Sequence, residues 1–424
     1  MKILLINNTD SGGGAAIAAV RLLNALNKNG IYARLGVEEK KSNNPFVFEL
    51  PRKRKTLMNK ISLKFMNYLI KVFHPILKIF IKINRFKTTN EILHSTNFKS
   101  KTDINWINNS DFDVVNLHWI SGTICNKDIA KITKPIAWTM HDTWPFCGAE
   151  HYPNILEHDE RYKHPYTRTN KPNSTKGIDL CRKVWLQKKK YLSNKNITFI
   201  SPSNWEAECI KESSLFSKNK CYVIHNVIPS DIYKKKDKQS IRKLLNIPDN
   251  KKVLGFGAAY GINNPRSVKG SFYLLQALQQ LKEPESYFLL VFGDAKEEFT
   301  SKISIDYQSM GSVSNPTIVS LFYNACDVFI CPSIVENLPN TCLESLFCGV
   351  PSVAFNSGGT KDIVEHKNTG YLAKPFDVND LANGIEWCIY NYENLTNNCI
   401  EKSIKDFDEK KIIQTYINTY SSLL

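Results

Sequence analysis

Several patterns that mark common protein classes are missing from this chain. None of its 11 cysteines lies in a C-x-x-C pair, so neither a zinc site nor a disulfide framework is expected. Cysteines 326, 331, 342 and 348 fall in apolar runs and are predicted to be buried thiols of a reducing cytoplasm. No run of about 18 uncharged apolar residues occurs, which argues against a transmembrane helix. The apolar run 3–6 is too short for a signal peptide and is interpreted as a buried strand.

Acidic residues are scarce relative to basic ones. The chain has 40 Asp and Glu against 56 Lys and Arg, a formal net charge of +16. This charge calls for an anionic partner: phosphate-bearing substrates, anionic lipid or nucleic acid. The segment 51–90 contains no Asp or Glu at all. On a helical wheel at about 100° per residue, its cations form one narrow stripe of Lys60, Lys64, Lys71, Lys78, Lys82 and Arg85.

A mostly apolar helix with one cationic stripe is typical of a segment that lies in a membrane interface. Pro75 is expected to kink or split this helix, and each cation near an anionic leaflet contributes about 1 kcal/mol. We therefore predict that the insertion 51–90 attaches a cytoplasmic protein peripherally to the inner face of the cell membrane. The alternative is a surface helix hairpin whose apolar side packs on the N-terminal domain. Nucleic acid is not expected, because the aromatics are not interleaved with the cations.

The remaining sequence predicts two α/β domains. Its 424 residues exceed what one hydrophobic core usually supports, and strand candidates alternate with helices, as in parallel sheets with crossover helices. The first half has strand candidates at 2–7, 113–118, 135–140 and 197–200, and a helix at 15–27. The second half has strand candidates at 252–257, 287–292, 328–331 and 351–355, and helices at 271–281, 317–324 and 341–348. We therefore predict an N-terminal Rossmann-like domain at 1–225, a C-terminal one at 226–400 and a helix at 401–424.

Glycines and histidines follow the strand candidates of the first half. Gly12 and Gly13 precede the first helix, where backbone N–H groups can approach a phosphate or sugar. The loop is not G-x-G-x-x-G, so a dinucleotide site is disfavoured and a tight turn is the alternative. His118 and His141-Asp142 end adjacent strand candidates at the carboxyl edge, where open α/β sheets bind ligands. With Trp144 they suit sugar binding, although a lone histidine is more often structural.

The second half carries two cations and two carboxylates. Arg266 and Lys269 enter the helix after strand 252–257 and suit a diphosphate clamp; a solvated basic loop is the alternative. Glu336 lies in a loop and Glu344 on the next helix, where carboxylates can accept hydrogen bonds from ribose or sugar hydroxyls. The intervening loop residues are also expected to face the donor: Asn337, Leu338 and Pro339.

Glu-x7-Glu, followed by Cys-Gly-Val-Pro at 348–351 and Ser-Gly-Gly at 357–359, resembles the donor-binding signature of family 4 glycosyltransferases. The glycine loop, His141-Asp142, Ser-Pro-Ser at 201–203 and Lys269-Gly270 stand in the family's order, so the resemblance covers nearly the whole chain. The form W-x-x-H-D-x-W-P-F at 138–146 resembles a bacterial branch that builds capsule, O-antigen or exopolysaccharide.

The resemblance implies the GT-B architecture: two Rossmann-like domains facing a cleft, with the last helix crossing back to the first domain. It implies retaining, metal-independent transfer from a nucleoside-diphosphate sugar to a saccharide or lipid-linked acceptor, without a cofactor. Glu344 would hold the ribose, Lys269 and Arg266 the diphosphate, and Glu336 and His141 the transferred sugar. His141, Lys269 and Glu336 are therefore the implied catalytic residues, while His118, Asp142 and Trp144 would contact sugar or acceptor.

Two departures from the family's pattern leave alternatives open. The family's usual arginine is replaced by Ala258 and Ala259, so Arg266 would have to substitute for it. Only Cys147 and Cys181 remain of a cysteine cluster seen in relatives, so no metal is predicted there. A nucleotide-sugar epimerase of the same architecture and a non-catalytic sugar-nucleotide or membrane-binding protein are the rival functions. A metal-dependent transferase would need Asp-x-Asp, and the sequence at 111–113 is better interpreted as a turn.

Overall fold

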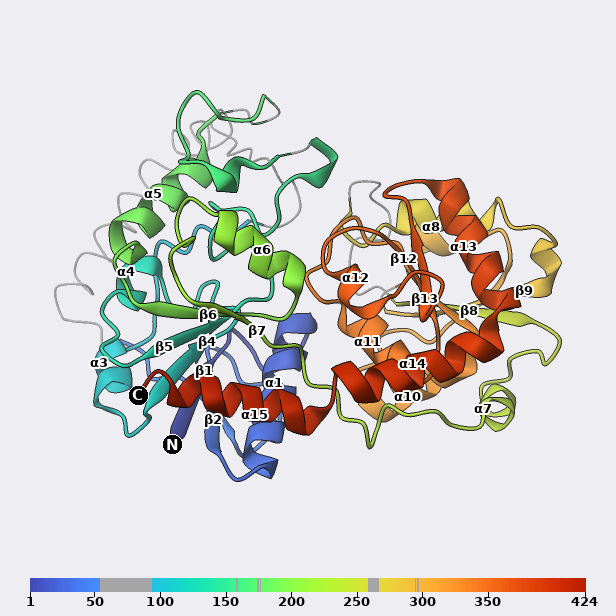
Figure 1. Ribbon diagram of the computed structural model, residues 1–424, viewed down its shortest axis with the longest axis horizontal. Helices are drawn as coiled ribbons and strands as arrows, with labels where there is room; N and C mark the ends of the chain where they lie inside the picture. Colours follow the sequence, from blue (N-terminus) through green and yellow to red (C-terminus); the bar gives the residue numbers. More distant parts are fainter. Residues whose placement is uncertain are drawn as a thin grey trace, which may run out of the picture.

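The computed structural model describes residues 1–53, 94–157, 159–173, 175, 177–257, 267–293, 295 and 297–424. Within these ranges the chain forms two α/β lobes that lie side by side, each built on a parallel sheet (Figure 1). Most of the predicted membrane insertion and Arg266 lie outside the described residues. No helix of the described ranges is long and apolar enough to cross a bilayer.

The N-terminal sheet has the strand order β3-β2-β1-β4-β5-β6-β7. Its strands are β1 (Lys2–Ile6), β2 (Tyr32–Val37), β3 (Val47–Glu49), β4 (Val114–Leu117), β5 (Ile136–Thr139), β6 (Ile197–Ser201) and β7 (Cys221–Val223). The central strands are buried on both faces, as expected where helices cover a parallel sheet on both sides. The covering helices are α1 (Gly14–Lys28), α3 (Ile104–Asn109), α4 (Asn126–Ile129), α5 (Leu180–Leu192) and α6 (Asn204–Glu212).

The C-terminal sheet repeats this plan with the order β10-β9-β8-β11-β12-β13. Its strands are β8 (Lys252–Gly257), β9 (Tyr287–Phe292), β10 (Asp306–Ser309), β11 (Val328–Cys331), β12 (Ser352–Phe355) and β13 (Gly370–Ala373). Its helices are α7 (Lys238–Leu244), α8 (Ser271–Leu278), α9 (Glu297–Thr300), α10 (Pro316–Ala325), α11 (Asn340–Phe347), α12 (Thr360–Ile363) and α13 (Val378–Tyr390). The predicted fold class, two parallel-sheet α/β domains, is confirmed.

The C-terminal segment differs from the single helix predicted at 401–424. The chain forms α14 (Tyr392–Asp406) and α15 (Glu409–Ser421), and Asp408 caps the second helix by accepting a hydrogen bond from the N–H of Lys411. α14 packs on α11, whereas α15 packs on α1 and so returns to the N-terminal lobe (Figure 1). There the buried Asn116 Nδ2 donates to Tyr420 Oη at 2.7 Å. A capping aspartate thus divides the segment between the two lobes.

In each sheet the strand order reverses direction at one point. This switch point lies between the neighbouring strands β1 and β4 in the first sheet and between β8 and β11 in the second. In open parallel sheets, ligands bind outside the carboxyl ends of the strands at such a switch point. A ligand site is therefore expected at the loops that leave these four strands.

Candidate active site

The two switch points lie close together across the boundary between the lobes. The side chain of Asn340, which begins α11 after β11, donates to the carbonyl of Gly14, which begins α1 after β1, at 3.2 Å. Ser203 Oγ of the N-terminal lobe donates to Asn337 Oδ1 at 2.6 Å. The N-termini of α1 and α11 thus meet, and helix N-termini attract anions through their unpaired N–H groups.

Lys269 and Glu336 form one side of the site. Lys269 Nζ lies 2.6 Å from Glu336 Oε1, which also accepts a hydrogen bond from Ser333 Oγ at 3.0 Å. Burial lowers the pKa of Lys269, but the Glu336 carboxylate outweighs it, so the pKa lies above its ordinary value. The lysine is therefore a stable cation, and its side chain is 41% exposed, which leaves it able to reach a phosphate.

Two glycine motifs bring backbone against the Glu336 loop. Gly270 has a positive φ of 66°, and a Cβ there would lie 1.7 Å from the carbonyl oxygen of Pro332. Gly358 has a φ of 64°, and a Cβ there would lie 2.2 Å from the carbonyl oxygen of Glu336. Only glycine fits such close approaches in the left-handed region. The Lys-Gly and Ser-Gly-Gly motifs therefore shape the loop that holds Glu336.

Glu344 occupies a second, more buried corner. Its Oε1 accepts from Arg21 Nη2 at 2.6 Å and its Oε2 from Tyr323 Oη at 2.8 Å, and the residue is 5% exposed. Arg21 comes from α1 and was not predicted as a site residue, because an Arg on an amphipathic helix carries no signal of its own. The predicted ribose carboxylate is thus held from both lobes.

The other predicted donor residues divide into exposed and buried groups. Gly12 and Gly13 have φ values of 77° and 86°, are exposed, and have no atom within 4 Å of where a Cβ would stand. Their backbone is open to a ligand at the start of α1. Asn337 and Leu338, by contrast, are 3% and 6% exposed, and the Leu338 side chain belongs to the core. The donor roles predicted for Asn337, Leu338 and Pro339 are therefore best met by their backbone groups.

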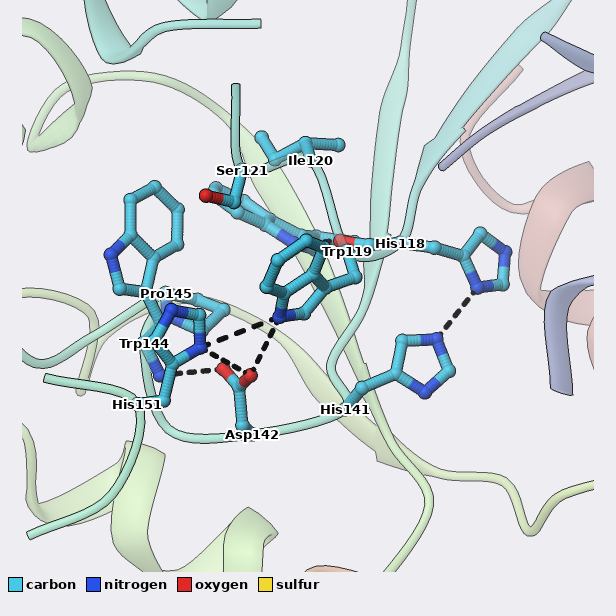
Figure 2. A pocket seen from close by; sticks show the side chains of 10 residues that line it. His118, Trp119, Ile120, Ser121, His141, Asp142, Trp144, Pro145 and His151 are labelled. Carbon is cyan, nitrogen blue, oxygen red and sulfur yellow. Dashed lines mark hydrogen bonds and ion pairs between the residues drawn. The ribbon is translucent and has the colours of Figure 1, made fainter. Parts of the chain in front are cut away.

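His118 and His141 form a directly bonded pair in the N-terminal lobe. His118 Nδ1 lies 2.9 Å from His141 Nε2, so one ring donates and the other accepts (Figure 2). Burial lowers the pKa of His141 to about 4, against a smaller upward effect of Asp142. Burial, then the neighbouring His141, holds the pKa of His118 well below its ordinary value. Both rings are therefore neutral near pH 7 and act through hydrogen bonds.

Asp142 lines a small pocket whose wall also includes the histidine pair (Figure 2). Its Oδ2 accepts from Trp119 Nε1 at 3.0 Å and lies 2.6 Å from His151 Nδ1, and His151 Nε2 lies 2.7 Å from Ser95 Oγ. Burial raises the pKa of Asp142, but His151 and the N–H of Trp144 lower it by more. The pKa therefore lies below its ordinary value. Asp142 thus orients the pocket wall as a carboxylate.

Trp144 belongs to the wall of this pocket and is only 3% exposed. Its indole N–H donates to the carbonyl of Ser95 at 2.9 Å, and the ammonium of Lys188 lies 3.7 Å from its ring centroid. Lys188 Nζ also donates to the carbonyls of Trp144, Cys147 and Gly148. The aromatic that remains partly exposed in the pocket is Trp119. The sequence analysis did not include Trp119, Ser95 or His151 in the site.

All four of Cys326, Cys331, Cys342 and Cys348 are buried free thiols, as predicted. Within the described part of the chain, no group of three or more His, Cys, Asp or Glu side chains is arranged to hold a metal ion.

Comparison with known proteins assigns the C-terminal lobe. Residues 237–406 match the family described as glycosyl transferases group 1. This stretch of the chain is similar to a group 1 glycosyltransferase domain. This confirms the resemblance drawn from Glu336 and Glu344, although the roles of the individual site residues stay predictions.

Curated relatives match part of the chain. It is 32% identical over 151 residues to an uncharacterized glycosyltransferase of Haemophilus influenzae, which covers 34% of this chain and 41% of the relative. It is 28% identical over 163 residues to the N,N'-diacetylbacillosaminyl-diphospho-undecaprenol alpha-1,3-N-acetylgalactosaminyltransferase of Campylobacter jejuni, which covers 37% and 42%. The chain thus spans less than half of the length of these two relatives.

Solved structures match the chain over its whole length or nearly so. Anabaena HepE in complex with UDP and glucose superposes with a TM-score of 0.64 at 18% identity, with 100% of both chains covered. WaaG, a glycosyltransferase involved in lipopolysaccharide biosynthesis, superposes with a TM-score of 0.58 at 12% identity and 99% coverage of each. At such identities the likeness concerns the fold, which is GT-B.

Proposed function

We propose that the protein is a retaining, metal-independent glycosyltransferase that moves a sugar from a nucleoside-diphosphate sugar to a saccharide or lipid-linked acceptor in bacterial surface polysaccharide synthesis. The main support for this proposal is the arrangement of charged residues and helix N-termini between the lobes. In the lobe that matches the group 1 glycosyltransferase family, Lys269 pairs with Glu336, and Glu344 pairs with an arginine of α1. At the adjoining switch points, Asn340 at the start of α11 donates to Gly14 at the start of α1. A cation, hydroxyl-binding carboxylates and two helix N-termini are what a sugar nucleotide requires.

The donor would be bound through groups matched to its parts. Glu344 accepts hydrogen bonds from the ribose hydroxyls, and Lys269 meets the diphosphate, whose leaving charge it offsets together with the N-termini of α1 and α11. Glu336 accepts from hydroxyls of the transferred sugar. The neutral His141 donates or accepts one hydrogen bond to that sugar from the opposite lobe.

The reaction would proceed on one face of the sugar. The bond from the anomeric carbon to the phosphate oxygen breaks while the acceptor oxygen forms its bond on the same face, which retains the configuration. The acceptor's proton passes to an oxygen of the departing phosphate, so no protein carboxylate is needed as base. The acceptor would approach from the side of the N-terminal lobe that carries Trp119, whose partly exposed indole offers an aromatic face to a sugar.

The relatives and neighbours support the substrate classes. The Campylobacter jejuni relative is named for an undecaprenol-linked acceptor, and HepE was solved with UDP and glucose. Attachment to the inner membrane surface rests on the cationic stripe of 51–90, which lies outside the described residues.

A panel of nucleoside-diphosphate sugars tests the proposal. The full chain is screened by thermal shift, then assayed for sugar release and for transfer to a lipid-linked saccharide, with and without EDTA. We expect one donor to stabilise the protein, EDTA to have no effect, and proton NMR to show a product with the donor's anomeric configuration. Accumulation of an epimerised free sugar would favour the epimerase instead, and an inverted product would refute retention.

A further inference from the structure

The corner around Glu344, which is proposed to bind the ribose, contains a guanidinium group from the other lobe. Arg21 projects from α1 of the N-terminal lobe, and its Nη2 lies 2.6 Å from Glu344 Oε1 on α11. The two side chains are 10% and 7% exposed. An ion pair this buried is far less screened than one at the surface, so its geometry is strongly enforced.

Two tyrosines complete the corner. Tyr233 accepts from Arg21 Nη2 at 3.0 Å, and the guanidinium carbon lies 5.1 Å from its ring centroid. Tyr323 donates to Glu344 Oε2 at 2.8 Å. Each carboxylate oxygen therefore receives one hydrogen bond, from a different direction. A carboxylate has about four lone-pair positions, so both oxygens keep capacity for a further donor while the group cannot rotate.

One donor atom of this corner also lacks a partner among the described residues. Arg21 Nη1 is buried and has no acceptor among the described residues. A buried donor without a partner is costly, whereas hydroxyl and carbonyl oxygens of a nucleoside would supply the acceptor. The same corner therefore offers carboxylate lone pairs and a free N–H to one ligand.

We propose that Arg21 is a positioning residue of the nucleotide site: it holds the Glu344 carboxylate in the orientation that receives the ribose hydroxyls. This inference rests on the proposed function, and it adds a residue from the opposite lobe. Because α1 and α11 belong to different lobes, the orientation of Glu344 depends on how the lobes are arranged. Nucleotide affinity is thereby coupled to that arrangement, and the coupling passes through one ion pair.

The experiment measures how much the ribose hydroxyls contribute to binding. Isothermal titration calorimetry gives the Kd of UDP, GDP and ADP and of their 2′,3′-dideoxy forms for the full chain and for Arg21→Gln, Arg21→Lys and Lys28→Gln. Lys28 is a matched control, because it lies on the same helix and pairs with Glu409 at 3.2 Å, but its side chain is 69% exposed.

In the wild type we expect the hydroxylated form of the preferred nucleotide to bind at least about tenfold more tightly than its dideoxy form, as two hydrogen bonds to a carboxylate imply. Arg21→Gln should reduce this ratio towards one. Arg21→Lys, which keeps the charge but not the planar fork, should restore part of it, and Lys28→Gln should leave it unchanged.

Other outcomes separate the two hypotheses. A wild-type protein that binds none of the nucleotides overturns the proposed function and the inference with it. Arg21→Gln that weakens hydroxylated and dideoxy forms by the same factor shows a purely structural ion pair, and an unchanged ratio shows no role; either result overturns the inference alone. Should Arg21→Gln fail to fold, a wild-type ratio in Arg21→Lys would also overturn it.

Discussion

The neutral histidine pair predicts how the stability of the N-terminal lobe depends on pH. The pKa of His141 is about 4 in the folded protein, against about 6.5 for an unfolded histidine. Between these values the unfolded chain binds the extra proton, so stability is complete above pH 6.5 and falls as the pH drops towards 4. At about 1.4 kcal/mol per pH unit, His141 alone accounts for a loss of about 3 kcal/mol.

Urea unfolding between pH 7.5 and 4 measures this loss, followed by tryptophan fluorescence. Six of the seven tryptophans precede residue 226, and only Trp387 follows it, so the signal reports on the N-terminal lobe. His141→Asn cannot titrate and should show a fall in the free energy of unfolding that is about 3 kcal/mol smaller than in the wild type. The exposed His164 gives the control His164→Asn, which should follow the wild-type curve. Parallel curves for wild type and His141→Asn would refute the assignment of His141 as a neutral, partly buried group.

Three further predictions concern the site and its surroundings. Lys188→Met strands three carbonyls that the ammonium now contacts and should lower the free energy of unfolding by about 3 kcal/mol; an unchanged urea midpoint would contradict this contact. Glu336→Gln should reduce turnover on the order of a hundredfold with little change in affinity for the free nucleoside diphosphate, and equal losses in both would assign it to the nucleotide instead. Replacing the cations of 51–90 by glutamine should release the protein from anionic vesicles at moderate salt in co-sedimentation, whereas continued binding would exclude the stripe as the anchor.

The sheet strands were predictable where burial on both faces leaves an unbroken apolar run. β1, β8, β9 and β12 were found on this basis within a residue or so at their ends. The edge strand β10 escaped, because its sequence Asp-Tyr-Gln-Ser is largely exposed and carries no such signal. The break between α14 and α15 escaped for another reason. The hydrophobic periodicity of the segment does not reveal the N-cap Asp408, which is recognised only by its residue type at the start of a helix.

The site residues, like the strands, were predictable only where a local sequence pattern fixes their position. Residues that leave strand ends, such as His141, Lys269 and Glu336, could be placed at one sheet edge because topology alone fixes that edge. Partners that arrive from elsewhere could not be inferred. Ser95 reaches His151 across 56 residues, and Arg21 reaches Glu344 across 323.

Contacts that hold the site residues in place therefore include long-range pairs, which no short sequence motif contains. Glu336 keeps its partner Lys269 within its own lobe, so its geometry survives any movement between lobes. Glu344 shares its carboxylate between Tyr323 of its own lobe and Arg21 of the other. If the lobes separate, the sugar carboxylate stays in position while the nucleotide carboxylate loses one of its two supports. The two glutamates of the signature thus differ in what holds them, and only the ribose end of the donor reports on the arrangement of the lobes.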